Sequence, residues 1–186
     1  MTKAEIRKNA MRERRGLSEA EVEDYSRRML LQFSSLDFSD VKTVHVFLPI
    51  VEKREPDTFL FIEWLREVHP EIRILVPRAD FDTALMTHHV YTGAEDLQKN
   101  LYNILEPQKS DIHTGDIDLV LVPLLAFDLL GYRVGYGKGF YDRFLAPIET
   151  RKIGLSFFGP VQDISDVHEN DVRLDACITP GGIFEF

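Results

Sequence analysis

Hydrophobic positions near the N-terminus recur every three to four residues, which predicts two amphipathic helices. The first is expected to end near Gly16. The second begins in the run 17–22, which has the capping-box pattern with Ser18 at the N-cap and Glu21 at the third helical position. Its apolar face continues for about four turns, formed by Val22, Tyr25, Met29 and Phe33.

Short apolar runs rich in β-branched and aromatic residues predict the strands. The first two, 43–48 and 72–76, are each followed by a proline that is expected to end the strand. The run 117–122 is almost continuously apolar, as expected for a central parallel strand covered on both faces. Further strands are predicted over 86–91, 152–157 and 176–179, with the tail 179–186 forming a turn and a short apolar end.

Helices are predicted between these strands. Asp57 or Thr58 can cap one whose inward face contains Phe61, Trp64 or Leu65, and Val68. Another covers about 139–146. Strand, helix and strand at this spacing indicate parallel α/β architecture. We therefore expect residues 1–186 to form a single-domain, three-layer α/β/α fold with a mostly parallel central sheet.

Composition restricts the class of protein further. The 186 residues are 44% hydrophobic and 28% charged, without an apolar run of the roughly 18 residues that a membrane-spanning helix needs. The single cysteine, Cys177, falls in a strand and is expected to be an apolar filler, so we expect a cytoplasmic protein that makes no membrane contact. The net charge of −9 argues against nucleic acid as a partner.

The charge is unevenly distributed along the chain. Residues 1–15 contain six basic and two acidic residues, so the remaining 171 residues carry −13. Lys3, Arg7, Met11 and Arg14 or Arg15 recur at helical spacing, which gives the first helix a cationic stripe. This stripe is either a solvated helix face or part of an anion site, depending on whether the fold brings it to other ligand-binding groups.

A glycine-rich segment offers such groups. Gly131, Gly135, Gly137 and Gly139 lie just past a buried strand and just before a helix, where open α/β sheets bind ligands. Glycine backbone can approach phosphate oxygens closely, and Arg133 and Lys138 add positive charge. The spacing matches neither a Walker A loop nor a dinucleotide fingerprint. A polyphosphate site is one interpretation, and a flexible turn is the other.

Carboxylates and histidines are the candidate metal ligands in the sequence. Asp142 at the opening of the following helix and Asp171 ahead of the last strand could hold Mg²⁺ together with phosphate oxygens, although an N-cap role explains Asp142 equally well. The six histidines lack metal-binding spacing, and His88 and His89 are expected to point to opposite faces of a strand.

The segment L-V-P-L-L-A-F-D-L-L-G-Y-R-V-G-Y-G-K-G-F-Y-D-R at 121–143 closely resembles the signature of the 5-formyltetrahydrofolate cyclo-ligase family. Four further motifs fall where that family has counterparts: Lys3-x-x-x-Arg7, E-P-D-T at 55–58, L-E-P at 105–107, and N-D-V-R-L-D at 170–175. The resemblance therefore covers essentially the whole chain.

The resemblance implies an ATP- and Mg²⁺-dependent ring closure that converts 5-formyltetrahydrofolate, free or polyglutamylated, to 5,10-methenyltetrahydrofolate. ATP would phosphorylate the formyl oxygen, N10 would attack the resulting carbon, and phosphate would leave with ADP already formed. Such chemistry depends mainly on positioning and charge stabilisation. A phosphotransferase for another metabolite and a non-catalytic nucleotide binder are the alternatives. We expect a monomer.

When the functional residues of the family are assigned to the matching positions of this sequence, the resemblance implies three groups of ligand-binding residues. Lys3 and Arg7 would hold ATP phosphates, Asp142 and Asp171 would ligate or orient Mg²⁺, and Glu55 with the Leu48 backbone would contact the pterin. The catalytic residues would be Arg133, Lys138 and Tyr141. The ATP loop would comprise Arg133, Val134, Gly135, Tyr136, Gly137, Lys138, Gly139, Phe140 and Tyr141.

Three departures from the family pattern affect these assignments. Phe140 stands where a tyrosine is usual, so that hydroxyl is not essential here. The segment 49–54 is about two residues longer than is common, which makes Glu52 the rival of Glu55 for the pterin. Asn103 replaces a glycine, and asparagine tolerates the left-handed backbone that a glycine there would supply.

Overall fold

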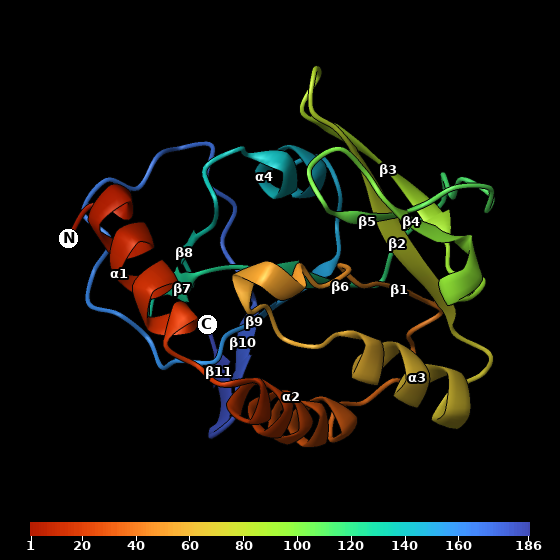
Figure 1. Ribbon diagram of the computed structural model, residues 1–186, viewed down its shortest axis with the longest axis horizontal. Helices are drawn as coiled ribbons and strands as arrows, with labels where there is room; N and C mark the ends of the chain where they lie inside the picture. Colours follow the sequence, from red (N-terminus) through yellow and green to blue (C-terminus); the bar gives the residue numbers. More distant parts are fainter.

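A seven-stranded sheet forms the centre of the molecule in the computed structural model, which describes residues 1–186 (Figure 1). Its strand order is β11-β10-β9-β6-β1-β2-β3. These strands are β1 (Thr43–His45), β2 (Arg73–Asp80), β3 (Leu85–Val90), β6 (Leu119–Pro123), β9 (Arg151–Leu155), β10 (Ala176–Thr179) and β11 (Gly182–Glu185). The helices are α1 (Lys3–Arg15), α2 (Glu19–Ser34), α3 (Phe59–Val68) and α4 (Phe140–Leu145).

Two small hairpins and two short 3₁₀ helices complete the fold. One hairpin pairs β4 (Leu97–Lys99) with β5 (Leu105–Pro107), and the other pairs β7 (Ala126–Phe127) with β8 (Arg133–Val134). The 3₁₀ helices are η1 (Val51–Lys53) and η2 (Ala94–Asp96). Asn103 in the β4–β5 hairpin has φ of 62°, so it does adopt the left-handed conformation expected of it.

The predicted mostly parallel sheet is confirmed. Strand β6 lies between β1 and β9, pairs parallel with both, and is buried along most of its length. The β1–β2 and β9–β10 pairs are also parallel, whereas β3 and β11 add antiparallel edges. The connection through α3 joins β1 to β2, as the strand–helix–strand pattern predicted.

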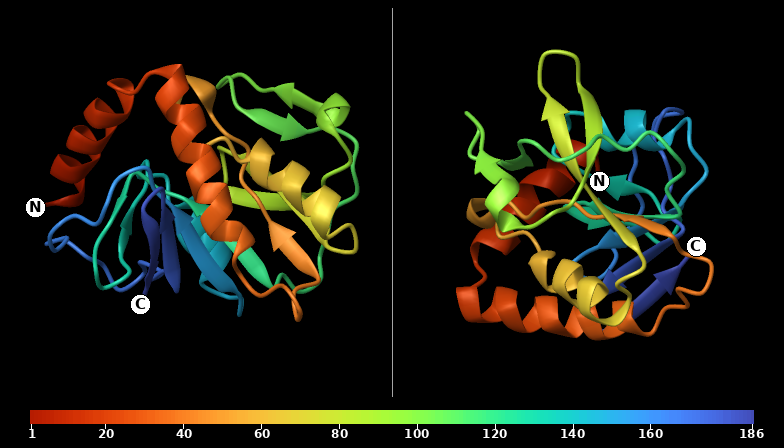
Figure 2. Two further views of the ribbon diagram at one scale, coloured as in Figure 1. Left: turned by 90° about the horizontal axis from the view of Figure 1, so that it is seen from below. Right: turned by 90° about the vertical axis from the view of Figure 1, so that its right-hand side faces the viewer.

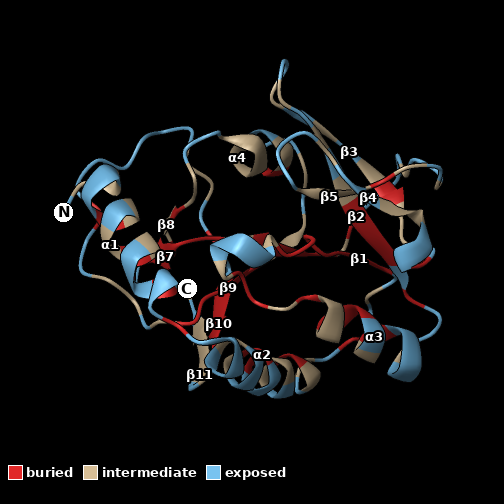
Figure 3. Ribbon diagram, viewed as in Figure 1, coloured by how far each residue is buried: buried red, intermediate tan, exposed pale blue.

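The two faces of the sheet are covered unequally (Figures 2 and 3). Helices α2 and α3 cover one face, where Phe33 packs against Phe61 and Trp64 at ring-centroid distances of 5.1 and 5.7 Å. The other face is covered by the six-residue α4 together with irregular chain. Cys177 is fully buried in this second core, which agrees with its predicted role as an apolar filler.

Helix boundaries follow the local signals closely. The α2 capping box between Ser18 and Glu21 is present as predicted, and Thr2 and Glu5 form a second box at the start of α1. Helix α3 follows Thr58, but the Thr58 hydroxyl donates to the Phe47 carbonyl at 2.5 Å instead of capping the helix. The inward placement of Val68 was wrong, since that side chain is 50% exposed. None of the helices has the length and apolar character needed to cross a bilayer.

The prediction that Pro77 ends its strand was wrong. The Val46 N–H donates to the Leu75 carbonyl at 2.9 Å, so every second residue of β2 directs its backbone groups toward β1. Pro77 is the next residue in that series, and β1 has already ended at His45. The missing N–H of Pro77 therefore affects only the side toward β1, and antiparallel pairing with β3 on the other side, from Leu75 opposite Val90 to Asp80 opposite Leu85, continues β2 to Asp80.

The C-terminal tail also differs from expectation. The predicted turn is present at residues 180–181, but the short apolar end after it forms β11, which pairs antiparallel with β10 from Ala176 opposite Glu185 to Thr179 opposite Gly182. Phe184 of this strand packs edge-on against Phe127 at 5.5 Å. The strand is only four residues long, so its alternation was too brief to be recognised before its partner was known.

Candidate functional site

Helix α1 is fixed by a small apolar core of its own. Ile6 and Ala10 are buried against Leu125, Ala126 and Val134, which come from the β7–β8 hairpin and the residue before it. This packing turns the predicted cationic stripe toward the glycine-rich loop, residues 131–139. The Arg7 Nε donates to the Gly135 carbonyl at 2.8 Å, so the stripe is not simply a solvated face.

The glycine-rich loop needs its glycines at the positions nearest α1 and α4. Gly137 has φ of +94°, and a Cβ there would lie 3.3 Å from Nη2 of Arg7. Gly139 has φ of +73° and precedes α4 as its N-cap residue. The N-cap interpretation of Asp142 was therefore wrong, because Asp142 lies within the first turn of α4.

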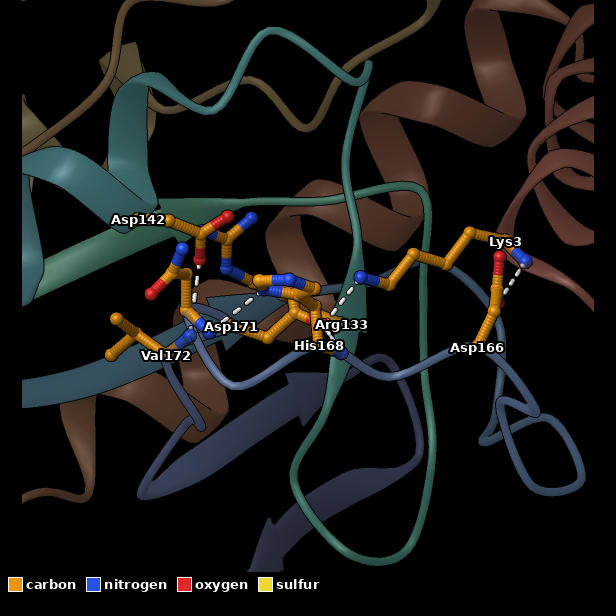
Figure 4. A network of polar contacts seen from close by, with 8 residues as sticks. Lys3, Arg133, Asp142, Asp166, His168, Asp171 and Val172 are labelled. Atoms are coloured by element: carbon orange, nitrogen blue, oxygen red, sulfur yellow. Dashed lines mark hydrogen bonds and ion pairs between the residues drawn. The ribbon is translucent and has the colours of Figure 1, made fainter.

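A network of polar contacts joins α1, α4 and the 166–172 segment (Figure 4). Arg133 Nη2 donates to Asp142 Oδ1 at 2.9 Å, and the same oxygen accepts the Val172 N–H at 3.1 Å. Asp171 Oδ2 accepts the His168 N–H at 2.7 Å and is ion-paired with the Lys3 ammonium. The Lys3 N–H donates to Asp166 at 2.7 Å.

These groups surround one cavity of about 440 Å³ at the carboxyl ends of β1 and β6. The structure places every predicted site residue on its lining except Val134, which is buried beneath the loop against α1. Leu48 and Glu55 line the same cavity as the cations. The predicted residues that it brings together are Lys3, Arg7, Leu48, Glu55, Arg133, Gly135, Tyr136, Gly137, Lys138, Gly139, Phe140, Tyr141, Asp142 and Asp171.

Two buried donors on the cavity wall have no hydrogen-bond partner. They are Arg133 Nε and the Tyr141 hydroxyl. Burial lowers the pKa of Arg133, while the Asp142 carboxylate favours the charged guanidinium. Burial also raises the pKa of Tyr141, which keeps its hydroxyl protonated. An unsatisfied buried donor costs about 1–3 kcal/mol, and a polar ligand in the cavity would offset that cost.

Glu55 is a buried carboxyl group at the other end of the cavity. It is 5% exposed, and its Oε1 accepts the Ile50 N–H at 2.8 Å. Burial raises the pKa of Glu55 to about 7, and the nearby Arg14 and Lys53 charges only partly counter that effect. The rival residue, Glu52, is exposed, bonded to Lys99 and Asn103, and absent from the cavity lining.

Asp142 and Asp171 are compatible with a magnesium ion. Each uses one carboxylate oxygen in the network, while Oδ2 of Asp142 and Oδ1 of Asp171 make no hydrogen bond. Burial acts to raise the pKa of Asp171, but hydrogen bonds from His168 and Lys3 outweigh it and keep that pKa low. The protein has no group of three or more acidic, histidine or cysteine ligands. This donor set fits Mg²⁺, which commonly binds one or two carboxylates together with phosphate oxygens.

Sequence reasoning missed the apolar wall of the cavity. Pro77, Ala79 and Phe81 of the β2–β3 hairpin and the loop that joins its strands contribute to it, together with Met86 and Ile104. Phe81 packs against Tyr102 at 4.3 Å and edge-on against Phe140 at 5.2 Å. The assumption that β2 ends at Pro77 hid this wall, because it removed the strand that carries it.

A ligand cavity at the carboxyl ends of parallel strands, with a glycine-rich loop, cations and carboxylates, is typical of ligand-binding α/β proteins, and this lining is suited to an anionic group beside an apolar one. Residues 1–180 match the model of the 5-formyltetrahydrofolate cyclo-ligase family, and the chain belongs to that family.

Individual relatives agree with this assignment. A solved 5,10-methenyltetrahydrofolate synthetase from Aquifex aeolicus superposes with a TM-score of 0.78 at 29% identity, covering 100% of this chain and 93% of that one. The Escherichia coli 5-formyltetrahydrofolate cyclo-ligase is 30% identical over 77% of this chain and 81% of its own. The mitochondrial cyclo-ligase of Arabidopsis thaliana is 29% identical over 81% of this chain, but this match spans only 58% of the plant protein.

We expect Glu55 to titrate near neutral pH in the free protein. In a ¹³C NMR titration of labelled glutamate carboxyl groups, one signal should have a midpoint at about pH 7. Glu55→Gln should remove that signal and Glu52→Gln should retain it. A spectrum in which every glutamate titrates near 4.5 would contradict the burial argument.

The same shift determines how stability depends on pH. The folded pKa of Glu55 lies above its unfolded value, so its stabilising contribution is present below about pH 4.5 and is lost as the pH rises through about 7. The free energy of unfolding of the natural protein, relative to Glu55→Gln, should therefore fall between those pH values.

Proposed function

We propose that the protein catalyses the ATP- and Mg²⁺-dependent cyclisation of 5-formyltetrahydrofolate to 5,10-methenyltetrahydrofolate, releasing ADP and phosphate. One observation carries the proposal: a single cavity joins a cluster of cations and glycine backbone to a buried carboxyl group and an apolar wall. The reaction needs such a pair of half-sites, because a triphosphate must be held in line with the oxygen of a neutral formamide.

The cationic half-site is suited to a triphosphate. Lys3, Arg7, Arg133 and Lys138 all line it, and Lys138 is exposed at the rim. Charge-assisted hydrogen bonds from such groups to phosphate are stronger than neutral ones. Arg133 Nε, which is buried and unpaired, gives the transferring phosphoryl group a donor that makes no bond within the protein.

The other half-site is suited to the pterin. The 2-amino group and ring N–H of a 2-aminopyrimidinone donate two parallel hydrogen bonds, which an ionised Glu55 would accept. The backbone around Leu48 lies beside it on the cavity lining. Phe81, Met86 and Ile104 provide an apolar surface for the remaining ring system.

The protein's own part in the reaction is positioning and charge stabilisation. A formyl oxygen is a poor leaving group until it carries a phosphoryl group from ATP. N10 then forms a bond to the formyl carbon and loses its proton, and the C–O bond breaks so that this oxygen leaves in phosphate. Arg133 and Lys138 would stabilise the negative charge that develops on the phosphoryl oxygens, and Tyr141 would donate its hydroxyl proton in a hydrogen bond.

Mg²⁺, when bound, neutralises phosphate charge. Asp142 or Asp171 would hold it through the carboxylate oxygen that makes no hydrogen bond within the protein. Asp142 has a second task, since it also orients Arg133 at 2.9 Å.

The reaction can be tested directly by following absorbance of the methenyl product. Purified protein with 5-formyltetrahydrofolate and Mg-ATP should form product, and omission of ATP or chelation of Mg²⁺ should stop it. ATP consumption that does not depend on 5-formyltetrahydrofolate would instead indicate a phosphotransferase for another metabolite. A protein that binds nucleotide and neither consumes ATP nor forms product would be a non-catalytic binder.

Arg133→Ala should lower kcat as well as the apparent affinity for ATP, because its contact with the phosphoryl group strengthens in the transition state. Loss of a charged hydrogen bond of about 1.5–3 kcal/mol corresponds to a decrease of about 10- to 100-fold in kcat/KM. Arg133→Lys serves as the variant that keeps the Asp142 ion pair. Full activity of Arg133→Ala would remove Arg133 from the mechanism.

Lys3→Ala combined with Arg7→Ala should raise KM for ATP by about 10-fold or more, with the thermal unfolding midpoint little changed. The matched control is Lys8→Ala with Arg12→Ala, which removes two charges from the exposed side of the same helix. Equal KM values in the two double variants would mean that Lys3 and Arg7 do not bind ATP and belong to a solvated helix face.

A further inference from the structure

Arg14 is the most deeply buried cation of helix α1, with 4% of its surface exposed. Of the two arginines that could continue the cationic stripe, Arg14 points inward and Arg15 is exposed. Burial of a charged side chain is costly unless its donors are satisfied. The groups around Arg14 must therefore accept hydrogen bonds from its guanidinium.

The Arg14 guanidinium donates four hydrogen bonds to three separate segments. Nε and Nη2 both donate to the Lys53 carbonyl, at 3.0 and 2.7 Å. Nη2 also donates to the Tyr136 hydroxyl at 2.9 Å, and Nη1 donates to the Leu124 carbonyl at 3.3 Å. The acceptors are uncharged, and they belong to η1, the glycine-rich loop and the chain after β6.

Two of these segments carry opposite halves of the cavity. Lys53 ends η1 and lies two residues before Glu55, at the proposed pterin end. Tyr136 lies in the glycine-rich loop at the proposed phosphate end. The Lys53 ammonium lies 4.2 Å from the Tyr136 ring centroid, so the Tyr136 ring contacts η1 directly, while its hydroxyl is linked to η1 through Arg14.

We propose that Arg14 is a positioning residue for the cyclisation, one that joins the loop that holds the phosphates to the turn that holds the pterin. This inference rests on the proposed function. A planar guanidinium suits the task because its donors project in fixed directions and can bond several acceptors at once, which the single ammonium of lysine cannot reproduce. Arg14 itself is absent from the cavity lining, so it acts through Tyr136 and the η1 turn.

The charge of Arg14 supports the same assignment. The titratable groups around Glu55 are Arg14 on α1, Lys53 on η1, Tyr136 in the glycine-rich loop and Tyr141 on α4. Burial raises the pKa of Glu55, and among the groups that lower this pKa the Arg14 charge has the largest effect. Removing the Arg14 charge should therefore move ionisation of Glu55 to higher pH.

The experiment compares Arg14→Met and Arg14→Lys with Arg15→Met, which removes the same charge from the exposed neighbouring position. Dissociation constants for ADP alone and 5-formyltetrahydrofolate alone are measured by calorimetry, and kcat is measured with both substrates. Misplacement of two reacting groups by about 1 Å can cost about 100-fold in rate. We expect kcat of Arg14→Met to fall about 10- to 100-fold, with each dissociation constant changed less than about threefold when it is measured above the pH range in which Glu55 ionises.

Two further readouts separate positioning from a purely structural role. The rising limb of kcat/KM with pH should move upward in Arg14→Met and stay near pH 7 in Arg14→Lys and Arg15→Met. Tyr136→Phe removes one acceptor of Arg14 and should produce part of the loss in kcat. If Arg14→Met does not fold, Tyr136→Phe still tests the contact between Arg14 and the glycine-rich loop.

Hydrogen exchange of the ligand-free protein tests the link independently of catalysis. Arg14→Lys should increase exchange both in residues 50–55 and in the glycine-rich loop, and Arg15→Met should change neither. Lack of product formation by the natural protein would overturn the proposed function, while the exchange result would still decide the link. Unchanged exchange in both segments, or a kcat for Arg14→Lys and Tyr136→Phe equal to that of Arg15→Met, would overturn the role of Arg14.

Discussion

The cavity depends on the burial of one side of α1 against the β7–β8 hairpin. Ile6 and Ala10 fix the rotation of the helix about its axis, and residues three, four and seven positions apart on a helix share a face. That rotation places Lys3, Arg7 and Arg14 toward the glycine-rich loop. Lys8 and Arg12 consequently face solvent. The N-terminal helix is therefore a wall of the site, although it contributes no residue to the central sheet.

Carboxylates make the concentration of positive charge at this wall tolerable. Arg133 is paired with Asp142 and Lys3 with Asp171, so two of the cations have counter-charges before any anion enters. Arg14 is different, because its bonds go to uncharged oxygens. The partly buried ion pairs of Arg133 and Lys3 contribute to orientation more than to stability. Their geometry determines which way the Arg133 guanidinium and the Lys3 ammonium point.

Local patterns in the sequence were sufficient for the features that depend on neighbouring residues. The Ser18–Glu21 capping box, the apolar face of α2 and the buried character of β6 each follow from a few adjacent positions. Features that depend on distant partners were missed. Pro77 was misread because β3, which pairs with β2 as far as Asp80, is a distant partner, and β11 needed β10 to be recognised.

The residues of the site also divide into those that the sequence predicts and those that only the fold places. The glycine-rich loop, the cations and the carboxylates could be named from residue type, spacing and family resemblance. Placement of Val134 beneath the loop could not, because its burial depends on where α1 packs. The choice between Arg14 and Arg15 likewise required the helix rotation. Glu55 was distinguished from Glu52 only by burial, which reflects the path of the whole 49–56 segment.

The proline within β2 also affects how readily this edge of the strand could pair with another chain. Beyond His45, the edge of β2 that faced β1 would be an open row of donors and acceptors, and such rows invite pairing with a foreign strand. Pro77 removes the first donor from that row. The wall beside the cavity therefore stays accessible to a small molecule while offering an incomplete template to another polypeptide.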